Sequence, residues 1–272
     1  MTEEKPGSAN PEADSPDKTA RNLFARTLFT AWFCCILVFI MPVLILFFPV
    51  VCLLRRGRFD AVVRNLTYLF GRLTTHCSRP FLRIQKTGFA RFAWDRPCIL
   101  VCNHRSFVDI FMCSHLPEPT AVVVVRYWPS RIPVVGFFIR AGRYAIVEQT
   151  PARELVSRGH QALSDGDSML FFPEGHRSRD GRLQPFQSGA FRVAAATGMP
   201  IVPVVLEGTE NLLPVGRKMP CPARIKLTLL DPVDPAQFQP EKRALHLRRH
   251  VENIYADFLG EPPLFEYAAE EE

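Results

Sequence analysis

Short apolar runs alternate with stretches of helical periodicity from Cys98 onward, and this alternation constrains the fold more than any other feature. Six runs are predicted to be strands: Cys98–Cys102, Thr120–Val125, Tyr144–Val147, Ser168–Phe172, Ile201–Leu206 and Ile225–Leu230. Five segments are predicted to be helices: Phe107–His115, Val134–Ala141, Arg153–Leu163, Gly189–Thr197 and Glu241–Leu259. Nearly continuous apolar strands separated by helices indicate an α/β fold with a mostly parallel sheet covered by helices.

An uncharged apolar run, Leu28–Leu54, precedes the alternating region. As a helix it would be about 40 Å long, which exceeds the roughly 30 Å hydrocarbon core of a bilayer. It is too long for the apolar part of a signal peptide. The sequence therefore predicts an N-terminal membrane-embedded helical segment, and a buried core helix is the less favoured interpretation.

Two arrangements of this membrane segment are open. Pro42 and Pro49 interrupt the run, and arginines flank it on both sides: Arg21, Arg26, Arg55, Arg56 and Arg58. One tilted, kinked span would place the more basic C-terminal flank in the cytoplasm. A shallow hairpin bent at Pro42 would leave both flanks on the cytoplasmic face. Either arrangement anchors the following domain on the cytoplasmic side of the inner membrane.

Apolar residues recur at helical spacing from Phe59 to Leu73, with Arg64 and Arg72 among them. This pattern predicts an amphipathic helix that lies in the membrane interface or packs on the next domain. The predicted organisation is a disordered tail at 1–20, a membrane anchor at 21–57, a juxtamembrane helix at 58–83, the α/β domain at 84–260 and an acidic tail at 261–272.

The formal charge of +6 and the pI of about 9 favour anionic partners. Phospholipid head groups, an acidic carrier protein and CoA all fit. Nucleic acid is a weaker choice, because the arginines are scattered through apolar segments and no nucleic-acid motif occurs. The eight cysteines form no C-x-x-C pair, so no structural zinc site is expected. Cysteines in apolar runs fit a reducing cytoplasm.

Two polar blocks follow predicted strands. The first reads Asn103-His104-Arg105-Ser106-Phe107-Val108-Asp109, and the second reads Phe172-Pro173-Glu174-Gly175-His176-Arg177-Ser178. His104 could take a proton from a hydroxyl, and Asp109 could fix the tautomer of its ring. Ser106 and Asp109 also fit a helix-capping box, with Ser106 as the N-cap. In the second block, Arg177 offers a planar fork to a phosphate.

Together the blocks resemble the His-(four residues)-Asp and Glu-Gly-x-Arg-Ser motifs of the lysophosphatidic acid acyltransferases, a family of glycerolipid acyltransferases. The resemblance runs from about Arg96 to about Leu206. It implies the glycerolipid acyltransferase fold. It also implies transfer of a fatty acyl group from acyl-CoA or acyl carrier protein to the free hydroxyl of a lysophospholipid, with His104 as general base. No cofactor or metal is implied beyond the acyl-donor substrate.

The resemblance also implies which residues bind the phosphate-bearing acceptor: Arg126, Glu174, Gly175, Arg177 and Ser178. Glu148 is a departure, because the family has an arginine there that is thought to contact the acceptor's phosphate. The preferred acceptor is 1-acylglycerol-3-phosphate, which gives phosphatidic acid. Because of Glu148, a lyso-ornithine lipid or lysophosphatidylethanolamine is the alternative acceptor. The segment from Ser188 to Arg192 resembles the family's next helix start, whose N–H groups suit an anion.

A non-catalytic membrane protein that binds lipid or carrier protein is the alternative from another functional class. The His104–Asp109 pair argues against it, because a pure binder needs no base. A soluble hydrolase is disfavoured, because the chain has no G-x-S-x-G elbow.

Overall fold

The computed structural model describes residues 16–54, 58–176, 182–213 and 219–262. In these residues, seven strands form one sheet in the order β1-β7-β6-β2-β5-β3-β4. They are β1 (Leu82–Thr87), β2 (Ile99–Cys102), β3 (Val122–Val125), β4 (Ala145–Ile146), β5 (Met169–Phe171), β6 (Ile201–Glu207) and β7 (Ala223–Leu229). Neighbouring strands are parallel except β6 and β7, which are antiparallel. The predicted α/β fold with a mostly parallel sheet is confirmed.

The central strand β2 is buried on both faces of the sheet. Ile99 pairs with Met169 of β5 on one side and with Ile201 of β6 on the other. Ile99 belongs to one hydrophobic cluster, and its neighbour Leu100 belongs to a second. Because successive side chains of a strand point to opposite faces, the two clusters lie on opposite sides of the sheet. This explains why the strand reads as a continuous apolar run.

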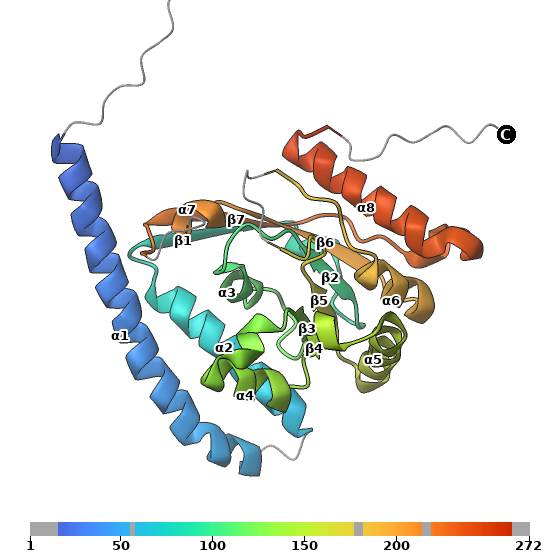
Figure 1. Ribbon diagram of the computed structural model, residues 1–272, viewed down its shortest axis with the longest axis horizontal. Helices are drawn as coiled ribbons and strands as arrows, with labels where there is room; N and C mark the ends of the chain where they lie inside the picture. The colour runs from blue at the N-terminus through green and yellow to red at the C-terminus, as the bar shows by residue number, and fades with distance from the viewer. Residues whose placement is uncertain (1–15, 55–57, 177–181, 214–218, 263–272) are drawn as a thin grey trace, which may run out of the picture.

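Helices cover both faces of the sheet (Figure 1). The cluster of Ile99 is covered by α5 (Ala152–Asp165), α6 (Gly189–Thr197) and α8 (Arg243–Leu259). The cluster of Leu100 is covered by α3 (Asp109–Cys113) and α7 (Thr209–Leu212), together with the N-terminal helix. A further helix, α4 (Pro133–Ala141), packs on the second helix of the chain. Within the described residues, five 3₁₀ turns connect these elements: Phe89–Arg91, Trp128–Arg131, Val147–Gln149, Pro235–Gln237 and Pro240–Lys242.

The N-terminal helix α1 runs without a break from Pro16 to Leu54. Of the two arrangements left open by the sequence, the hairpin bent at Pro42 is therefore wrong, because the helix continues through that proline. The predicted disordered tail at 1–20 is too long by five residues, because residues 16–20 are helical. Residues 1–15 and the basic flank at 55–57 lie outside the described part of the chain. The stretch Leu23–Ile40 is long and apolar enough to cross a membrane, judged by length and composition.

One stripe of α1 packs on the α/β domain. Phe29 and Ile36 are buried, and the Phe29 ring stacks on Phe81 with centroids 4.7 Å apart. Trp32 Nε1 donates a hydrogen bond to the carbonyl of Cys77 at 2.9 Å. The outward side of the helix carries exposed apolar side chains: Leu23, Phe24, Leu28, Val38, Phe39, Val43 and Leu46. The helix therefore joins the domain along a narrow stripe and carries these exposed apolar side chains on its outward side.

The second helix, α2 (Phe59–Cys77), packs against α1, α3 and α4. Of the two predicted placements, packing on the domain is therefore the observed one. Its buried side includes Val62, Val63 and Leu66, together with the guanidinium of Arg64. The helix ends before β1, so the juxtamembrane segment predicted at 58–83 includes the start of a strand that the sequence analysis did not predict.

Candidate active site

The predicted site residues lie at one edge of the sheet. In a parallel sheet the carboxyl ends of neighbouring strands meet at one edge, where α/β proteins bind their ligands. Strands β2, β5, β3 and β4 are neighbours in that order. The residues that follow them are, respectively, His104, Glu174, Arg126 and Glu148. The strand order therefore brings together residues that are far apart in the sequence.

His104 is held by Asp109 at this edge. His104 Nδ1 lies 2.8 Å from Asp109 Oδ2, and the Asp109 side chain is fully buried. The same oxygen accepts the backbone N–H groups of Arg105 and Ser106, each at 2.8 Å. Because the carboxylate acts as an acceptor, it fixes the proton of the ring on Nδ1. The other nitrogen, Nε2, is then the one that can receive a proton from a substrate.

The environment of the His104 ring restricts its orientation. Its side chain is 24% exposed, and its centroid lies 4.6 Å from that of Phe172, which follows β5. The ring is thus packed on one side and bound to a carboxylate at Nδ1. This combination places the imidazole at a partly open surface, where it can act as a base.

The predicted capping box is only half present. The Ser106 N–H donates to the carboxylate of Asp109, as expected, but the Ser106 hydroxyl donates to the carbonyl of Leu213 at 3.0 Å. Helix α3 begins at Asp109, so Ser106 is not its N-cap. The carboxylate of Asp109 therefore serves the His104 ring and the turn before the helix together.

Glu174 supports the backbone at His104. Its side chain is buried, and its two oxygens accept the N–H of His104 at 2.7 Å and that of Gln184 at 3.1 Å. Burial raises the pKa of this carboxyl to about 7, and the two backbone hydrogen bonds oppose the rise. Both oxygens are used within the protein, and contact between Glu174 and an acceptor stays a prediction.

Gly175, Arg126 and Glu148 form a second group beside His104. Gly175 has φ of +72°, a conformation that favours glycine. Its carbonyl accepts Arg126 Nη1 at 2.9 Å, and Arg126 Nε lies 2.7 Å from Glu148 Oε1. The other oxygen of Glu148 accepts the N–H of Tyr127 at 2.8 Å. Glu148, which stands where the family has an arginine, thus holds Arg126 against the second block.

Two predicted phosphate-binding residues, Arg177 and Ser178, lie outside the described residues. One residue that the sequence analysis gave no role is Asn103. Its buried amide donates to the carbonyl of Leu206 at 2.9 Å and accepts the N–H of Leu206 at 2.7 Å. It therefore ties the end of β2 to β6. A polar residue directly after a buried strand was the available signal.

Comparison with known proteins gives several relatives. The family model described as Acyltransferase matches residues 83–207. The chloroplast 1-acyl-sn-glycerol-3-phosphate acyltransferase BAT2 of Brassica napus is 34% identical over 163 residues, 58% of this chain and 47% of that protein. The corresponding LPAT1 of Arabidopsis thaliana is 31% identical over 219 residues, 77% of this chain and 59% of that protein. The chain thus spans about half the length of these two plant relatives.

A solved structure covers more of the chain. The crystal structure of the 1-acyl-sn-glycerophosphate acyltransferase PlsC from Thermotoga maritima is 27% identical, with a TM-score of 0.68. The match covers 89% of this chain and 97% of that one. The family model, the curated relatives and this structure agree with the resemblance carried by the two blocks, and the chain therefore belongs to the lysophosphatidic acid acyltransferase family.

Proposed function

We propose that the protein transfers a fatty acyl group from a thioester donor, acyl-CoA or acyl carrier protein, to the free hydroxyl of 1-acylglycerol-3-phosphate. The product is phosphatidic acid. The observation that carries the proposal is the 2.8 Å contact between His104 Nδ1 and the buried Asp109, which leaves Nε2 for a substrate. The names of the relatives from Brassica napus and Arabidopsis thaliana support this acceptor.

In the proposed reaction His104 acts as general base. Its Nε2 takes the proton of the acceptor hydroxyl while the hydroxyl oxygen attacks the thioester carbonyl. The C–S bond then breaks, the ester forms, and the thiolate takes the proton from the imidazolium. Asp109 stabilises the imidazolium, as the carboxylate of a triad does. Contact with the Phe172 ring restricts the orientation of the imidazole.

The phosphate-bearing acceptor is proposed to bind at Arg126, Glu174, Gly175, Arg177 and Ser178. Because of Glu148, the sequence allowed amine-bearing lyso-lipids as alternative acceptors. Its two oxygens are occupied by Arg126 and by the N–H of Tyr127. An amine of the acceptor would have to displace one of these partners. The arrangement therefore favours a phosphate bound beside Arg126 over an amine bound at Glu148.

The test is acyl transfer by purified protein in detergent, with 1-acylglycerol-3-phosphate, lysophosphatidylethanolamine and a lyso-ornithine lipid as acceptors. We expect turnover mainly on the first. His104→Ala should lose a factor on the order of a hundred to ten thousand in rate, and Asp109→Asn should also lose most activity. His160→Ala, which removes an exposed histidine of α5, is the matched control and should be unchanged.

Near-normal turnover by a folded His104→Ala protein would exclude the base role. A wild-type protein that acylates only the amine-bearing lipids would exclude 1-acylglycerol-3-phosphate as the acceptor.

A further inference from the structure

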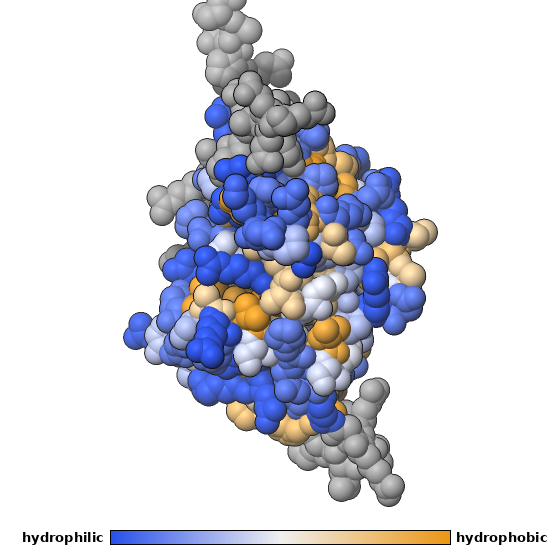
Figure 2. All heavy atoms as spheres, turned by 90° about the vertical axis from the view of Figure 1, so that its right-hand side faces the viewer, coloured by the Kyte–Doolittle hydropathy of each residue, from blue (hydrophilic) through white to orange (hydrophobic). Residues whose placement is uncertain are grey.

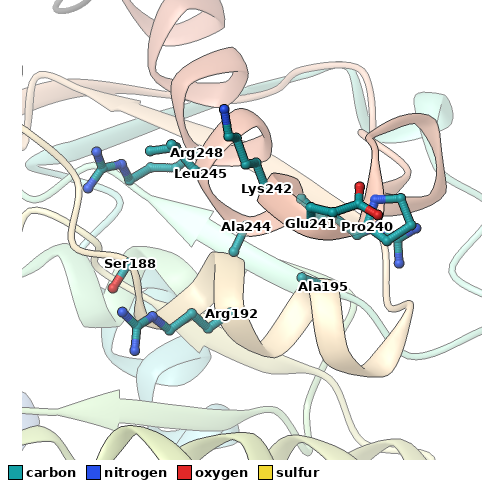
Figure 3. A pocket seen from close by; sticks show the side chains of 10 residues that line it. Ser188, Arg192, Ala195, Pro240, Glu241, Lys242, Ala244, Leu245 and Arg248 are labelled. Atoms are coloured by element: carbon teal, nitrogen blue, oxygen red, sulfur yellow. The ribbon is translucent and has the colours of Figure 1, made fainter.

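A basic cavity lies between α6 and the first turns of α8. Its volume is about 530 Å³, within the range of roughly 300–1,000 Å³ typical of small-molecule sites. Four cationic side chains line it, together with one acid and one hydroxyl: Arg192, Lys242, Arg243, Arg248, Glu241 and Ser188. Figure 3 shows Arg192 and Arg248 extending to the same side, next to Ser188. The cavity therefore favours an anionic ligand.

Two of these cations are anchored. Arg243 Nε donates to the carbonyl of Phe238 at 3.1 Å. Arg248 Nη1 donates to the carbonyl of Phe186 at 3.4 Å, and its Nε lies 3.8 Å from the buried carboxylate of Glu252. The side chains of the other two, Arg192 and Lys242, make no hydrogen bond or ion pair with the part of the chain that the structure describes. Anchored and unpaired cations around one hollow provide a site for several negative charges.

The cavity adjoins the loop that supports His104. Ser188 precedes α6, and the preceding residue, Gln187, donates its N–H to the carbonyl of Pro173 at 2.7 Å. Pro173 is followed by Glu174, which binds the N–H of His104. No side chain caps the first turn of α6, so its N–H groups are available to an anion. A ligand in the cavity would lie beside the loop of the proposed reaction.

We propose that this cavity binds the 3′-phosphorylated ADP part of acyl-CoA, so that the acyl donor is a CoA thioester. The proposal rests on the proposed acyl transfer, because it assigns the donor of that reaction. Several phosphates on one small group match four cations in a hollow of this size. The convex acidic surface of a carrier protein matches such a hollow less well.

A lipid head group is a weaker occupant. Helices α6 and α8 lie on the side of the molecule away from α1 (Figure 1). That side is mainly hydrophilic, with scattered apolar residues (Figure 2). A soluble donor can reach the cavity there, whereas a lipid in a membrane that contacts the outer side of α1 would be distant from it.

Binding of adenosine 3′,5′-bisphosphate, measured by calorimetry without acceptor, tests the site directly. The variants are the double substitution Arg192→Gln with Lys242→Gln and the control Arg153→Gln, which removes an exposed arginine of α5 outside the cavity. We expect the wild type and the control to bind equally and the double variant to bind about ten- to a hundredfold more weakly, since each charge-assisted hydrogen bond contributes roughly a factor of ten.

Steady-state kinetics give the second readout. The double variant should raise the KM for acyl-CoA by a similar factor and leave the acceptor KM unchanged. With an acyl thioester of N-acetylcysteamine, which has no nucleotide, the double variant and the wild type should be equal.

Three results would overturn the proposal: no binding of the bisphosphate by wild type, equal binding by the double variant and the control, or a loss confined to acyl carrier protein as donor. Binding is measured without acyl transfer. A protein that binds the bisphosphate in this cavity and yet acylates no lyso-lipid would therefore support the site and contradict the proposed function.

Discussion

Two buried carboxylates hold the His104 loop. Asp109 accepts the N–H groups of the His104 ring and of two backbone positions, while Glu174 accepts the backbone N–H of His104 itself. The two carboxylates come from separate elements, since Asp109 begins α3 and Glu174 follows β5. The position of the imidazole is therefore fixed by contacts from two separate parts of the fold.

The titration of Glu174 should make stability depend on pH. Burial raises its pKa to about 7, above the value near 4.5 of an unfolded carboxyl, so the folded protein binds the extra proton between these values. The stabilisation is present below pH 4.5 and is lost as the pH rises through 7. The slope approaches about 1.4 kcal/mol per pH unit in that window. Urea unfolding from pH 5 to pH 8, in detergent, measures it.

Glu174→Gln is the matched variant, because glutamine cannot titrate and keeps an acceptor oxygen for the N–H of His104. The difference in unfolding free energy between wild type and variant should shrink or reverse as the pH rises. Parallel pH profiles for the two proteins would show that Glu174 does not titrate in this range.

Helix α2 is attached to the α/β domain by a buried arginine. Arg64 Nε donates to the carbonyl of Thr120 at 2.6 Å, and Nη1 donates to that of Gly142 at 2.9 Å. Nη2 binds Asp167 at 2.6 Å, and the same carboxylate also binds Arg58. One guanidinium thus satisfies groups from three segments that are distant in the sequence.

Arg64→Met should destabilise the protein by about 3–5 kcal/mol, because it leaves Asp167 and two carbonyls buried with fewer partners. Arg72→Met, on the exposed side of the same helix, is the control and should cost less than about 1 kcal/mol. Chemical unfolding of the two variants in parallel gives both values. A cost for Arg64→Met no larger than that of the control would contradict a clamping role.

The sequence predicted most elements because the inner strands are continuous apolar runs. It missed β1, an edge strand in which only Leu82 is buried. Edge strands carry few apolar residues, so periodicity does not identify them. It also allowed a hairpin at Pro42, because a proline in isolation is expected to interrupt a helix. The aromatic contacts of Phe29 and Phe33 that hold α1 on the domain are not visible in the sequence.

Only those contacts of the candidate site that join residues close together in the sequence could be predicted. His104 and Asp109 are five residues apart, so their contact follows from local spacing. The bond from Glu174 to the N–H of His104, and that from Arg126 to Glu148, depend on the order of the strands in the sheet. Strand order was not predicted, and the roles of these two carboxylates therefore could not be.

Apolar surface is distributed unevenly over the molecule. The outward side of α1 is apolar and exposed, whereas the side that carries α5, α6 and α8 is mainly hydrophilic (Figure 2). This asymmetry supports the predicted membrane anchor: α1 would attach the protein to a membrane by its outward side, with the α5–α8 side toward water. The hydrophobic contacts of Phe29 and Ile36 stay within the protein.

Deleting α1 is a poor test of this attachment. The deletion would uncover the aromatic surface at Phe81 and Phe111 that Phe29 and Phe33 cover. Removing the residues up to and including Arg58 would also break the bond between Arg58 and Asp167. Newly exposed apolar surface binds membranes and detergent by itself, so retention of the truncated protein would not identify the anchor.

Two substitutions on the outward side are a sharper test. The side chains of Phe39 and Leu46 are 71% and 73% exposed, so Phe39→Asp with Leu46→Asp leaves the packed stripe intact. Each aspartate in the hydrocarbon core costs roughly 2.5–3.5 kcal/mol. The double variant should therefore leave the lipid fraction in a liposome flotation assay while keeping its activity in detergent. Gln161→Asp, on exposed α5, should float like the wild type. Flotation of the double variant equal to that of this control would mean that α1 is not the anchor.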